Sequence, residues 1–364
     1  EEDYVEHLFV ASTHDTMMFF TEKGRCYWLR VYEIPEGEKQ SKGRAIQNLI
    51  QLPPDDKVRT IIDVKKLDDK EFVQSHYIVL CTKKGIIKKT SLEDFSRPRA
   101  NGVNAITIVE GDQLLEARMT NGNSEIMMAV KSGRAIRFPE EKVRPTGRGA
   151  IGVAGIEVED ANDEVIGMIC VNKEDTSRTV LVVSEKGFGK RTAIDEYRIT
   201  NRGGKGVKTI NVTDKTGQLV GIKDVSEKED LIITCKSGIT LRTAISTIKE
   251  AGRATQGVIL IRLDDGDEIA AISKIDEQEE EEIPPRELHT REGERRQRGQ
   301  EDLADHAQNG DDDGVRVDAD EGHVVEHVLV VLPADLAGDQ VRRHLEQVRH
   351  RLERGRDRPD ERQQ

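Results

Sequence analysis

The sequence has few of the residues on which membrane, secreted and metal-binding proteins depend. Its four cysteines, Cys26, Cys81, Cys170 and Cys235, lie at least 55 residues apart and form no Cys-x-x-Cys pair. This spacing favours neither a zinc site nor a disulfide framework. No apolar stretch approaches the roughly 18 residues that cross a bilayer, and no signal peptide is visible. These absences predict a cytoplasmic protein whose cysteines are reduced core thiols.

Lysine is absent after residue 275, which divides the chain into two parts of different composition. Residues 1–275 hold 42 Lys plus Arg against 43 Asp plus Glu, whereas residues 276–364 hold 14 Arg against 26 Asp plus Glu. The formal net charge of −13 therefore belongs almost entirely to the C-terminal part. That part also lacks Phe, Tyr, Trp, Met, Cys and Ser. The acidic average thus does not exclude a nucleic-acid partner for residues 1–275.

One unit recurs five times within residues 1–275. Each copy begins with an apolar run of strand-forming residues, such as Tyr77–Cys81 or Val180–Ser184, followed by a glycine turn and a second short strand. The turn glycines are Gly24, Gly85, Gly133, Gly187 and Gly238. A second glycine follows 17 to 19 residues later, at Gly43, Gly102, Gly152, Gly206 and Gly257. The copies span about residues 5–66, 77–120, 125–171, 179–225 and 230–275.

The repeat predicts an all-β fold. Units of about four short strands that cannot bury their faces alone stack radially, so we expect a β-pinwheel, a propeller-like disc of four-stranded blades. A β-sandwich is the alternative, but it does not require such regular spacing. Leu8–Ala11 precedes the first unit, and we expect it to be an unpaired extra strand. Because the chain opens at Glu1 without Met, we also expect a fragment that lacks a preceding blade.

Cations recur at fixed positions of the repeat. Four residues after the turn glycine stand Lys89, Arg137, Arg191 and Arg242, and one residue earlier stand Lys88 and Lys190. The segments around the second glycines add Lys42, Arg44, Arg148, Arg202, Lys205 and Arg253. Equivalent positions of a disc share one radius, so these side chains predict a positive rim that follows a phosphate backbone without reading bases. Alternatively, Lys and Arg on exposed strands serve only solubility and edge protection.

The loop Asn201–Gly206 is the most distinctive string. Its three glycines let backbone amides approach a phosphate closely, while Arg202 and Lys205 supply positive charge. The alternative is a glycine-rich blade connection without a ligand.

Other motifs fail in their context. Gly147–Gly152 fits the dinucleotide fingerprint but leads into an expected strand rather than a helix. His323–His327 fits a zinc-peptidase string, which needs a helix and a third ligand. Because no nucleophile stands beside a base, we expect no catalytic residue, metal site or cofactor in this chain.

Several strings resemble the C-terminal domain of bacterial DNA gyrase A, among them Phe9–Asp15, Gly85–Thr90, Gly187–Ala193 and Gly252–Arg262. The resemblance covers residues 1–275. It implies a six-bladed β-pinwheel that wraps duplex DNA around a basic rim and supports ATP-dependent negative supercoiling by a bacterial type II topoisomerase. The rim cations named above then become candidate DNA contacts.

The resemblance also implies the surroundings of this domain. It would act in the cytoplasm, on the nucleoid, in an A2B2 assembly with the rest of gyrase A and with gyrase B, and ATP and Mg2+ would be used by that assembly. The family's Gln-Arg-Arg-Gly-Gly-Lys-Gly box belongs to the first blade, which we expect to precede Glu1, although Arg202–Gly206 resembles it. The family's catalytic tyrosine also lies outside this part. The alternatives are the C-terminal domain of topoisomerase IV and a propeller that binds another protein.

The C-terminal part divides again. Residues 276–282 are an acidic segment of the kind that this family often carries, and it can compete with DNA for the rim. Residues 283–364 do not resemble the family, and we expect them to be disordered or non-native. Within them, Val341, Leu345, Val348 and Leu352 have the spacing of an amphipathic helix.

Overall fold

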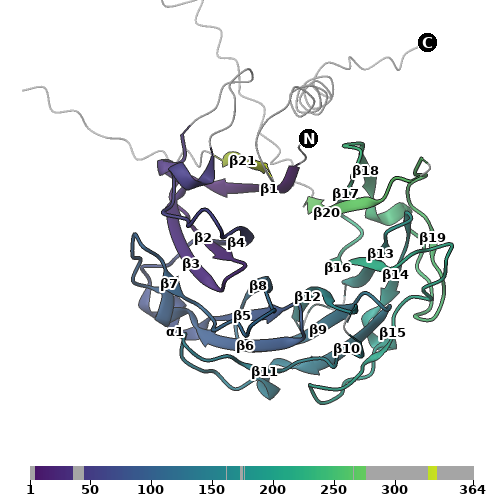
Figure 1. Ribbon diagram of the computed structural model, residues 1–364, viewed down its shortest axis with the longest axis horizontal. Helices are drawn as coiled ribbons and strands as arrows, with labels where there is room; N and C mark the ends of the chain where they lie inside the picture. Colours follow the sequence, from purple (N-terminus) through teal and green to yellow (C-terminus); the bar gives the residue numbers. More distant parts are fainter. Residues whose placement is uncertain are drawn as a thin grey trace, which may run out of the picture. The chain divides into compact units, whose positions relative to one another are not determined.

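Five small antiparallel sheets make up most of the described structure. The computed structural model describes residues 5–35, 45–160, 162–172, 175, 177–264, 266–275 and 327–333. All of these belong to one compact unit. Within it the sheets, numbered 1 to 5 in chain order, follow one another around a common axis (Figure 1). The predicted all-β, propeller-like class is confirmed. None of the helices among the described residues is long and apolar enough to cross a bilayer.

Each sheet places one strand near the axis and the others progressively outward. From the axis outward, sheet 1 contains β4 (Val58–Val64), β2 (Thr16–Thr21), β3 (Arg25–Arg30) and β7 (Val103–Asn104). Sheet 2 contains, in the same order, β8 (Leu114–Thr120), β5 (Tyr77–Thr82), β6 (Ile86–Ser91) and β11 (Val153–Ala154). Sheet 3 contains β12 (Val165–Asn172), β9 (Ser124–Val130), β10 (Arg134–Pro139) and β15 (Val207–Lys208). Sheet 4 contains β16 (Leu219–Val225), β13 (Thr179–Ser184), β14 (Phe188–Ala193) and β19 (Val258–Ile259). Sheet 5 contains β20 (Ile269–Ile275), β17 (Asp230–Cys235) and β18 (Thr240–Ala244).

The outermost strand of sheets 1 to 4 comes from the following repeat. In sheet 2, the turn residue Gly85 has a φ of 86°, and its carbonyl accepts the N–H groups of Gly155 and Ile156 at 2.8 and 3.3 Å. A Cβ at Gly85 would lie 2.4 Å from the Ile156 carbonyl oxygen, so only glycine fits. Consecutive repeats therefore interlock. The sequence repeat indicates the number of strands but not this exchange between neighbours.

A single turn of 3-10 helix follows each hairpin and directs the chain toward the outer edge. These turns are η1 (Val31–Glu33), η3 (Leu92–Phe95), η4 (Glu140–Lys142), η5 (Ile194–Glu196) and η6 (Ile245–Thr247). The first repeat also contains η2 (Ile46–Asn48) and α1 (Lys70–Ser75). The Asp69 carboxylate caps α1 by accepting the N–H groups of Glu71 and Phe72.

The apolar core lies between consecutive sheets. Met18 and Phe20 of β2 pack with Ile78 and Leu80 of β5 in one cluster, whereas Val79 and the residues alternating with it join the next cluster with sheet 3. Successive side chains of a strand point to opposite faces, so the second strand from the axis is buried on both faces in sheets 1 to 4. No repeat can do this alone, which is why the five stack.

The four cysteines lie in these cores. Cys26, Cys81 and Cys235 are buried, Cys170 is half-buried, and all four are free thiols. Burial raises the pKa of each thiol, which keeps it protonated and unreactive. The prediction that the cysteines are core residues is confirmed for Cys26, Cys81 and Cys235, whereas Cys170 lies only partly in the core.

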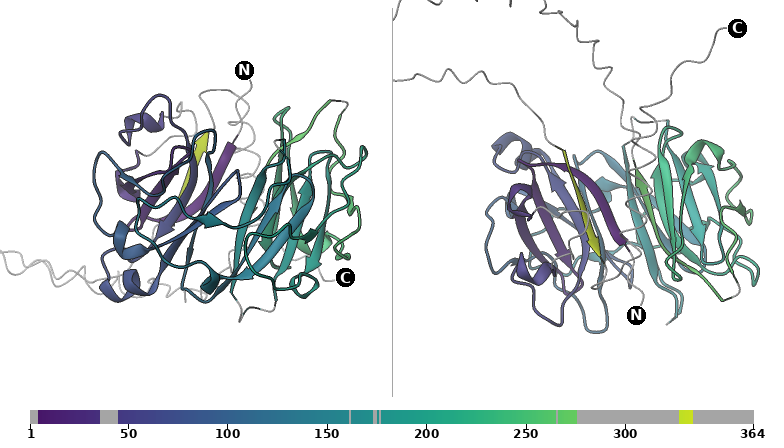
Figure 2. Two further views of the ribbon diagram at one scale, coloured as in Figure 1. Left: turned by 60° about the horizontal axis from the view of Figure 1, so that its bottom comes forward. Right: turned by 90° about the horizontal axis from the view of Figure 1, so that it is seen from above.

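A sixth, two-stranded sheet joins the N-terminal strand to the C-terminal part. β1 (Val5–Ser12) pairs antiparallel with β21 (His327–Pro333), with Phe9 opposite Val330 (Figures 1 and 2). The prediction that Leu8–Ala11 is unpaired is therefore wrong, because an exposed strand edge offers N–H and C=O groups that a distant strand can pair. Residues 276–326 and 334–364, including the acidic segment and the possible helix at 341–352, lie outside the described residues.

Candidate nucleic-acid interface

The lysines three residues after the turn glycine point into the protein. Lys88 and Lys190 are 1% and 0% exposed. The Lys88 Nζ donates to the Arg148 and Ala105 carbonyls, both at 2.6 Å, and the Lys190 Nζ donates to the Gly252 and Arg253 carbonyls. Burial lowers the pKa of each ammonium group to about 8. The predicted rim position of both lysines is wrong: neither can reach a phosphate, because backbone carbonyls surround each ammonium group.

Four cations stand four residues after a turn glycine, and three of them connect adjacent sheets. Lys89 is 5% exposed and pairs with Glu140 of η4 at 2.7 Å. The Arg137 Nη1 donates to the Ile194 carbonyl at 2.7 Å, and the Arg191 Nε donates to the Ile248 carbonyl at 2.8 Å.

The fourth such cation, Arg242 in the last sheet, has no following sheet among the described residues. It pairs with Asp230 of its own sheet, and about half of its side chain is exposed. The expectation of a rim position is therefore corrected for Lys89, Arg137 and Arg191, which hold neighbouring sheets together, whereas Arg242 stays accessible.

Exposed cations recur instead in four loops at the outer edge. Each loop runs from the end of a 3-10 turn to the short outermost strand (Figure 1). We call these outer loops 1 to 4, for residues 96–102, 141–152, 197–206 and 249–257. Their exposed or half-exposed cations are Arg97, Arg99, Lys142, Arg144, Arg148, Arg198, Arg202, Lys205, Lys249 and Arg253. The fold thus repeats one basic loop at four consecutive sheet junctions.

Of the residues predicted from sequence, the structure places Arg148, Arg202, Lys205 and Arg253 in these loops. The Arg202 guanidinium joins outer loop 3 to outer loop 2 and to β11 by donating to the Lys142 and Ala154 carbonyls at 3.1 and 3.0 Å. Lys205 lies 3.4 Å from the Glu159 carboxylate. The string Gly147–Gly152 also lies in outer loop 2 and leads into strand β11, so it starts no helix. Lys42 and Arg44 lie outside the described residues.

Arg144, Arg198 and Lys249 are exposed cations of the outer loops that were not predicted from the sequence. Each stands eleven residues after its turn glycine, directly after a buried apolar anchor, as Arg144 follows Val143. This fixed position in the repeat could have predicted them from the sequence. It lies after the hairpin, whereas the cations first noticed in the repeat lie within the hairpin.

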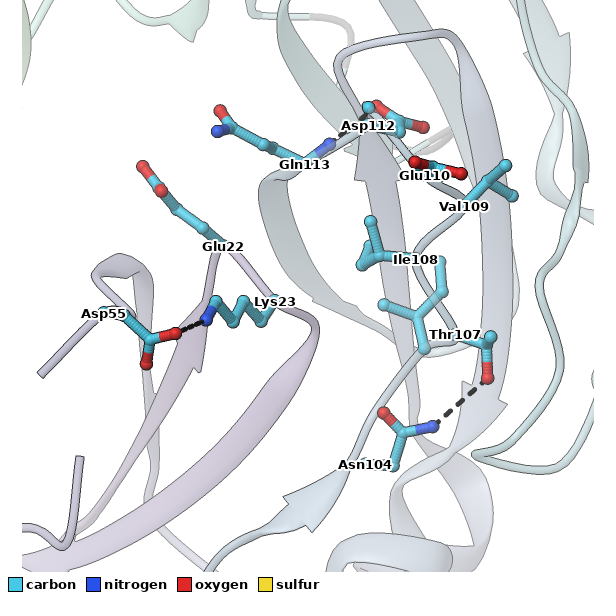
Figure 3. A pocket seen from close by; sticks show the side chains of 12 residues that line it. Glu22, Lys23, Asp55, Asn104, Thr107, Ile108, Val109, Glu110, Asp112 and Gln113 are labelled. Atoms are coloured by element: carbon cyan, nitrogen blue, oxygen red, sulfur yellow. Dashed lines mark hydrogen bonds and ion pairs between the residues drawn. The ribbon is translucent and has the colours of Figure 1, made fainter. Parts of the chain in front are cut away.

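A pocket beside the turn of sheet 1 has the opposite character. It is lined by Glu22, Lys23, Asp55, Asn104 and residues 106–113, and the Lys23 ammonium points at the Asp55 carboxylate (Figure 3). Glu110 and Asp112 add further negative charge, so the pocket disfavours a phosphate. In the part of the chain that the structure describes, no three His, Cys, Asp or Glu side chains come together as a metal site requires.

Comparison with known proteins decides the family. The family model described as "DNA gyrase C-terminal domain, beta-propeller" matches residues 15–65, 76–121, 124–172, 178–226 and 229–276. The chain belongs to the DNA gyrase C-terminal domain family. The matched segments coincide with the five repeats, one after another.

Full-length relatives of this family are longer than the chain. It is 43% identical over 280 residues to DNA gyrase A of Staphylococcus epidermidis, and 42% identical over 282 residues to that of Staphylococcus aureus. These alignments cover 77% and 78% of the chain but 31% of each relative, so the chain spans about a third of the curated relatives it matches.

Solved structures agree on the fold. A DNA gyrase A C-terminal domain superposes with a TM-score of 0.62 at 27% identity, covering 73% of this chain and 84% of that one. The C-terminal domain of a DNA topoisomerase IV gives a TM-score of 0.65 at 19% identity, covering 73% of this chain and 80% of that one. The second likeness supports the fold alone.

Proposed function

We propose that residues 5–275 bind duplex DNA along outer loops 1 to 4 without reading base sequence. The observation that carries this proposal is the recurrence of exposed Arg and Lys in the same loop at four consecutive sheet junctions. Such a row can contact several phosphates of one duplex, and neutralising phosphates releases counterions. Its members stand in loops whose ends are fixed by strands of neighbouring sheets, so they can act together.

The arrangement of the loops supports wrapping as well as binding. A duplex that follows loops around an axis must bend, and the cost of bending a stiff polymer is offset by contacts that only the bent form reaches. We propose that the chain bends DNA in one handed sense, as part of gyrase A in an A2B2 assembly with gyrase B. ATP, Mg2+ and the catalytic residues would belong to the rest of that bacterial, cytoplasmic, nucleoid-associated topoisomerase. An origin in topoisomerase IV has the weaker support, because that likeness extends only to the fold.

Ligation of nicked circular DNA tests the wrapping directly. Circles closed in the presence of the chain should show a shifted distribution of linking number that grows with protein concentration, because a handed wrap is trapped when the nick is sealed. Protein that binds the circles but leaves the distribution unchanged would limit the function to binding. The same assay at about 0.5 M salt serves as control, since screening should remove the shift.

A protein-binding surface is the second candidate. It is favoured by the exposed isoleucines of the outer edge, Ile151, Ile199 and Ile259, which are 47%, 55% and 53% exposed. The two functions differ in their response to salt. If about six phosphates are neutralised, the logarithm of the DNA-binding constant should fall with the logarithm of salt concentration at a slope of about −5. Apolar association would show little dependence.

The acidic segment at residues 276–282 should weaken DNA binding. Neutralising its six carboxylates with Asn and Gln is expected to tighten binding severalfold at low salt, because the segment then no longer competes with phosphates for the outer loops. Fluorescence anisotropy with a labelled duplex measures this. We choose substitution because a deletion of residues 276–364 would also remove β21, the partner of β1. Equal affinity of the two chains would exclude competition by this segment.

A further inference from the structure

A cation from the preceding sheet holds the main chain of each outer loop. The Arg25 Nη2 donates to the Asn101 carbonyl at 2.6 Å in outer loop 1, and the Lys88 Nζ donates to the Arg148 carbonyl at 2.6 Å in outer loop 2. The same pattern continues in the next two loops. The Arg134 Nε and Nη2 donate to the Lys205 and Gly206 carbonyls, both at 3.0 Å, and Lys190 donates to the Gly252 and Arg253 carbonyls. We call these four side chains, Arg25, Lys88, Arg134 and Lys190, the loop clamps.

The loop clamps alternate between two positions of the repeat. Arg25 and Arg134 stand one residue after the turn glycine, whereas Lys88 and Lys190 stand three residues after it. Positions one and three of a strand share a face, so both kinds reach the same loop. Where one position carries the cation, the other carries a large apolar or aromatic side chain, these being Tyr27, Ile86, Ile136 and Phe188. Each of the four sheets thus contributes one cation to its loop.

Sheet 5 shows the reverse case. Its two positions carry Ile239 and Leu241, so it has no cation to offer a loop. Among the residues that the structure describes, sheet 5 also has no outermost strand beyond β18. In sheets 1 to 4 a clamp and an outer loop therefore occur together, and among the described residues sheet 5 has neither. This correlation indicates that the cation serves the outer loop and is not needed to form the sheet itself.

The chemistry of the clamps is costly for a purely structural contact. The ammonium groups of Lys88 and Lys190 are buried, and this burial disfavours their charged form and lowers their pKa. In sheets 3 and 5 an apolar side chain fills the equivalent position, so the fold does not require a lysine there. In three of the four loops, moreover, the clamped carbonyl belongs to a residue that is itself basic, namely Arg148, Lys205 or Arg253. The main chain of that residue is fixed while its own side chain stays at least partly exposed.

We propose that Arg25, Lys88, Arg134 and Lys190 are positioning residues that preorganise the outer loops for a polyanion. The inference rests on the proposed function. A loop already fixed by its clamp loses less conformational entropy when it binds, so its basic side chain contributes more of its attraction to affinity. The clamps themselves do not touch the phosphate backbone. Lys88, Arg134 and Lys190 act through Arg148, Lys205 and Arg253, and Arg25 acts through outer loop 1.

A double-mutant cycle in the full chain tests this action through the loop. Lys88→Met keeps the aliphatic stem and removes the ammonium group, and Arg148→Ala removes the exposed cation that it positions. We expect Lys88→Met to weaken binding to a duplex by about threefold to tenfold in the parent chain, and by less than about 1.5-fold in the Arg148→Ala background. Effects that multiply independently would overturn the inference, since they would mean that Lys88 attracts DNA directly.

Two further variants guard against simple loss of the fold. Ile136→Met changes the equivalent position of sheet 3 without touching a clamp, and it should leave affinity unchanged. The pair Arg134→Met and Lys205→Ala repeats the cycle at a half-exposed clamp, where unfolding is not at issue, and the same non-additivity is expected. Additive effects in this second cycle would also overturn the inference.

Hydrogen exchange separates the clamp from the proposed function. Without any DNA, Lys88→Met should speed amide exchange across residues 146–152 and leave residues 197–206 unchanged, because only outer loop 2 loses its clamp. Unchanged exchange at residues 146–152 would refute the clamp whatever the DNA assays show. If the parent chain binds no DNA while exchange changes as expected, the proposed function fails and the clamp stands.

Discussion

Reversing the charge of one exposed cation in each outer loop is expected to weaken DNA binding severely. The variant is Arg97→Glu, Arg144→Glu, Arg198→Glu and Lys249→Glu, and all four side chains are exposed. Each change removes a phosphate contact and adds repulsion, so affinity should fall at least about 100-fold at about 0.1 M salt. The salt slope should flatten by roughly three to four, because about four fewer counterions are released. Anisotropy titrations at several salt concentrations measure both quantities.

A matched variant separates position from net charge. Lys65→Glu, Lys66→Glu, Lys70→Glu and Lys228→Glu make the same change of charge at exposed residues outside the outer loops. We expect it to weaken binding by no more than a few fold through long-range repulsion, which added salt should remove. Equal losses in the two variants would show that only the overall charge matters. Full affinity of the outer-loop variant would place the interface elsewhere.

Removing the Glu140 carboxylate is expected to destabilise the fold strongly. Glu140 is 0% exposed and accepts hydrogen bonds from the Thr120 hydroxyl at 2.7 Å and the Ser124 N–H at 3.1 Å, besides pairing with Lys89 at 2.7 Å. Glu140→Ala leaves the Lys89 ammonium buried without its counter-charge. Breaking a buried pair in this way costs about 3–5 kcal/mol. The melting temperature should fall by roughly 10 °C, as measured by circular dichroism.

Two companion variants identify the cause of that loss. Glu141→Ala changes the adjacent, exposed carboxylate and should leave the melting temperature within about 1 °C, as expected for a surface substitution. Adding Lys89→Met to Glu140→Ala removes the buried ammonium group that has lost its counter-charge, and it should restore part of the lost stability. The reason is that two apolar side chains cost less at this buried site than one unpaired ammonium group. If Glu140→Ala leaves the melting temperature unchanged, Lys89 and Glu140 do not hold sheets 2 and 3 together.

Most of the fold could be predicted from the sequence because its determinants are local. The turn glycines, the apolar runs and the spacing of the repeats each act within about 50 residues, and together they favour stacked β-blades. The exchange of the outermost strand could not be predicted in the same way. The contact between Gly85 and Ile156 joins different repeats, and a two-residue strand such as Val153–Ala154 carries no periodic signal.

The candidate site was predicted only in part. Arg148, Arg202, Lys205 and Arg253 lie where a phosphate could reach them, whereas Lys88, Lys89, Lys190 and Arg191 are buried. Nothing in the sequence around a strand lysine shows whether its ammonium group will be exposed or covered, because the covering residues belong to the neighbouring repeat. In sheet 2 the loop that covers Lys88 arrives 60 residues later in the chain, at Arg148.

The lack of lysine after residue 275, the five turn glycines and the recurring cations are properties of the sequence alone, and they determine the repeat, the fold class and the family. Only the tertiary structure decides which cations face solvent and which face carbonyl groups. The physical reason is that the strand exchange brings a loop of the following repeat over the outer strand of each hairpin and leaves basic side chains of that loop exposed. The lysine ammonium group therefore fixes a loop at Lys88, whereas at Lys249 it is exposed and can contact a phosphate.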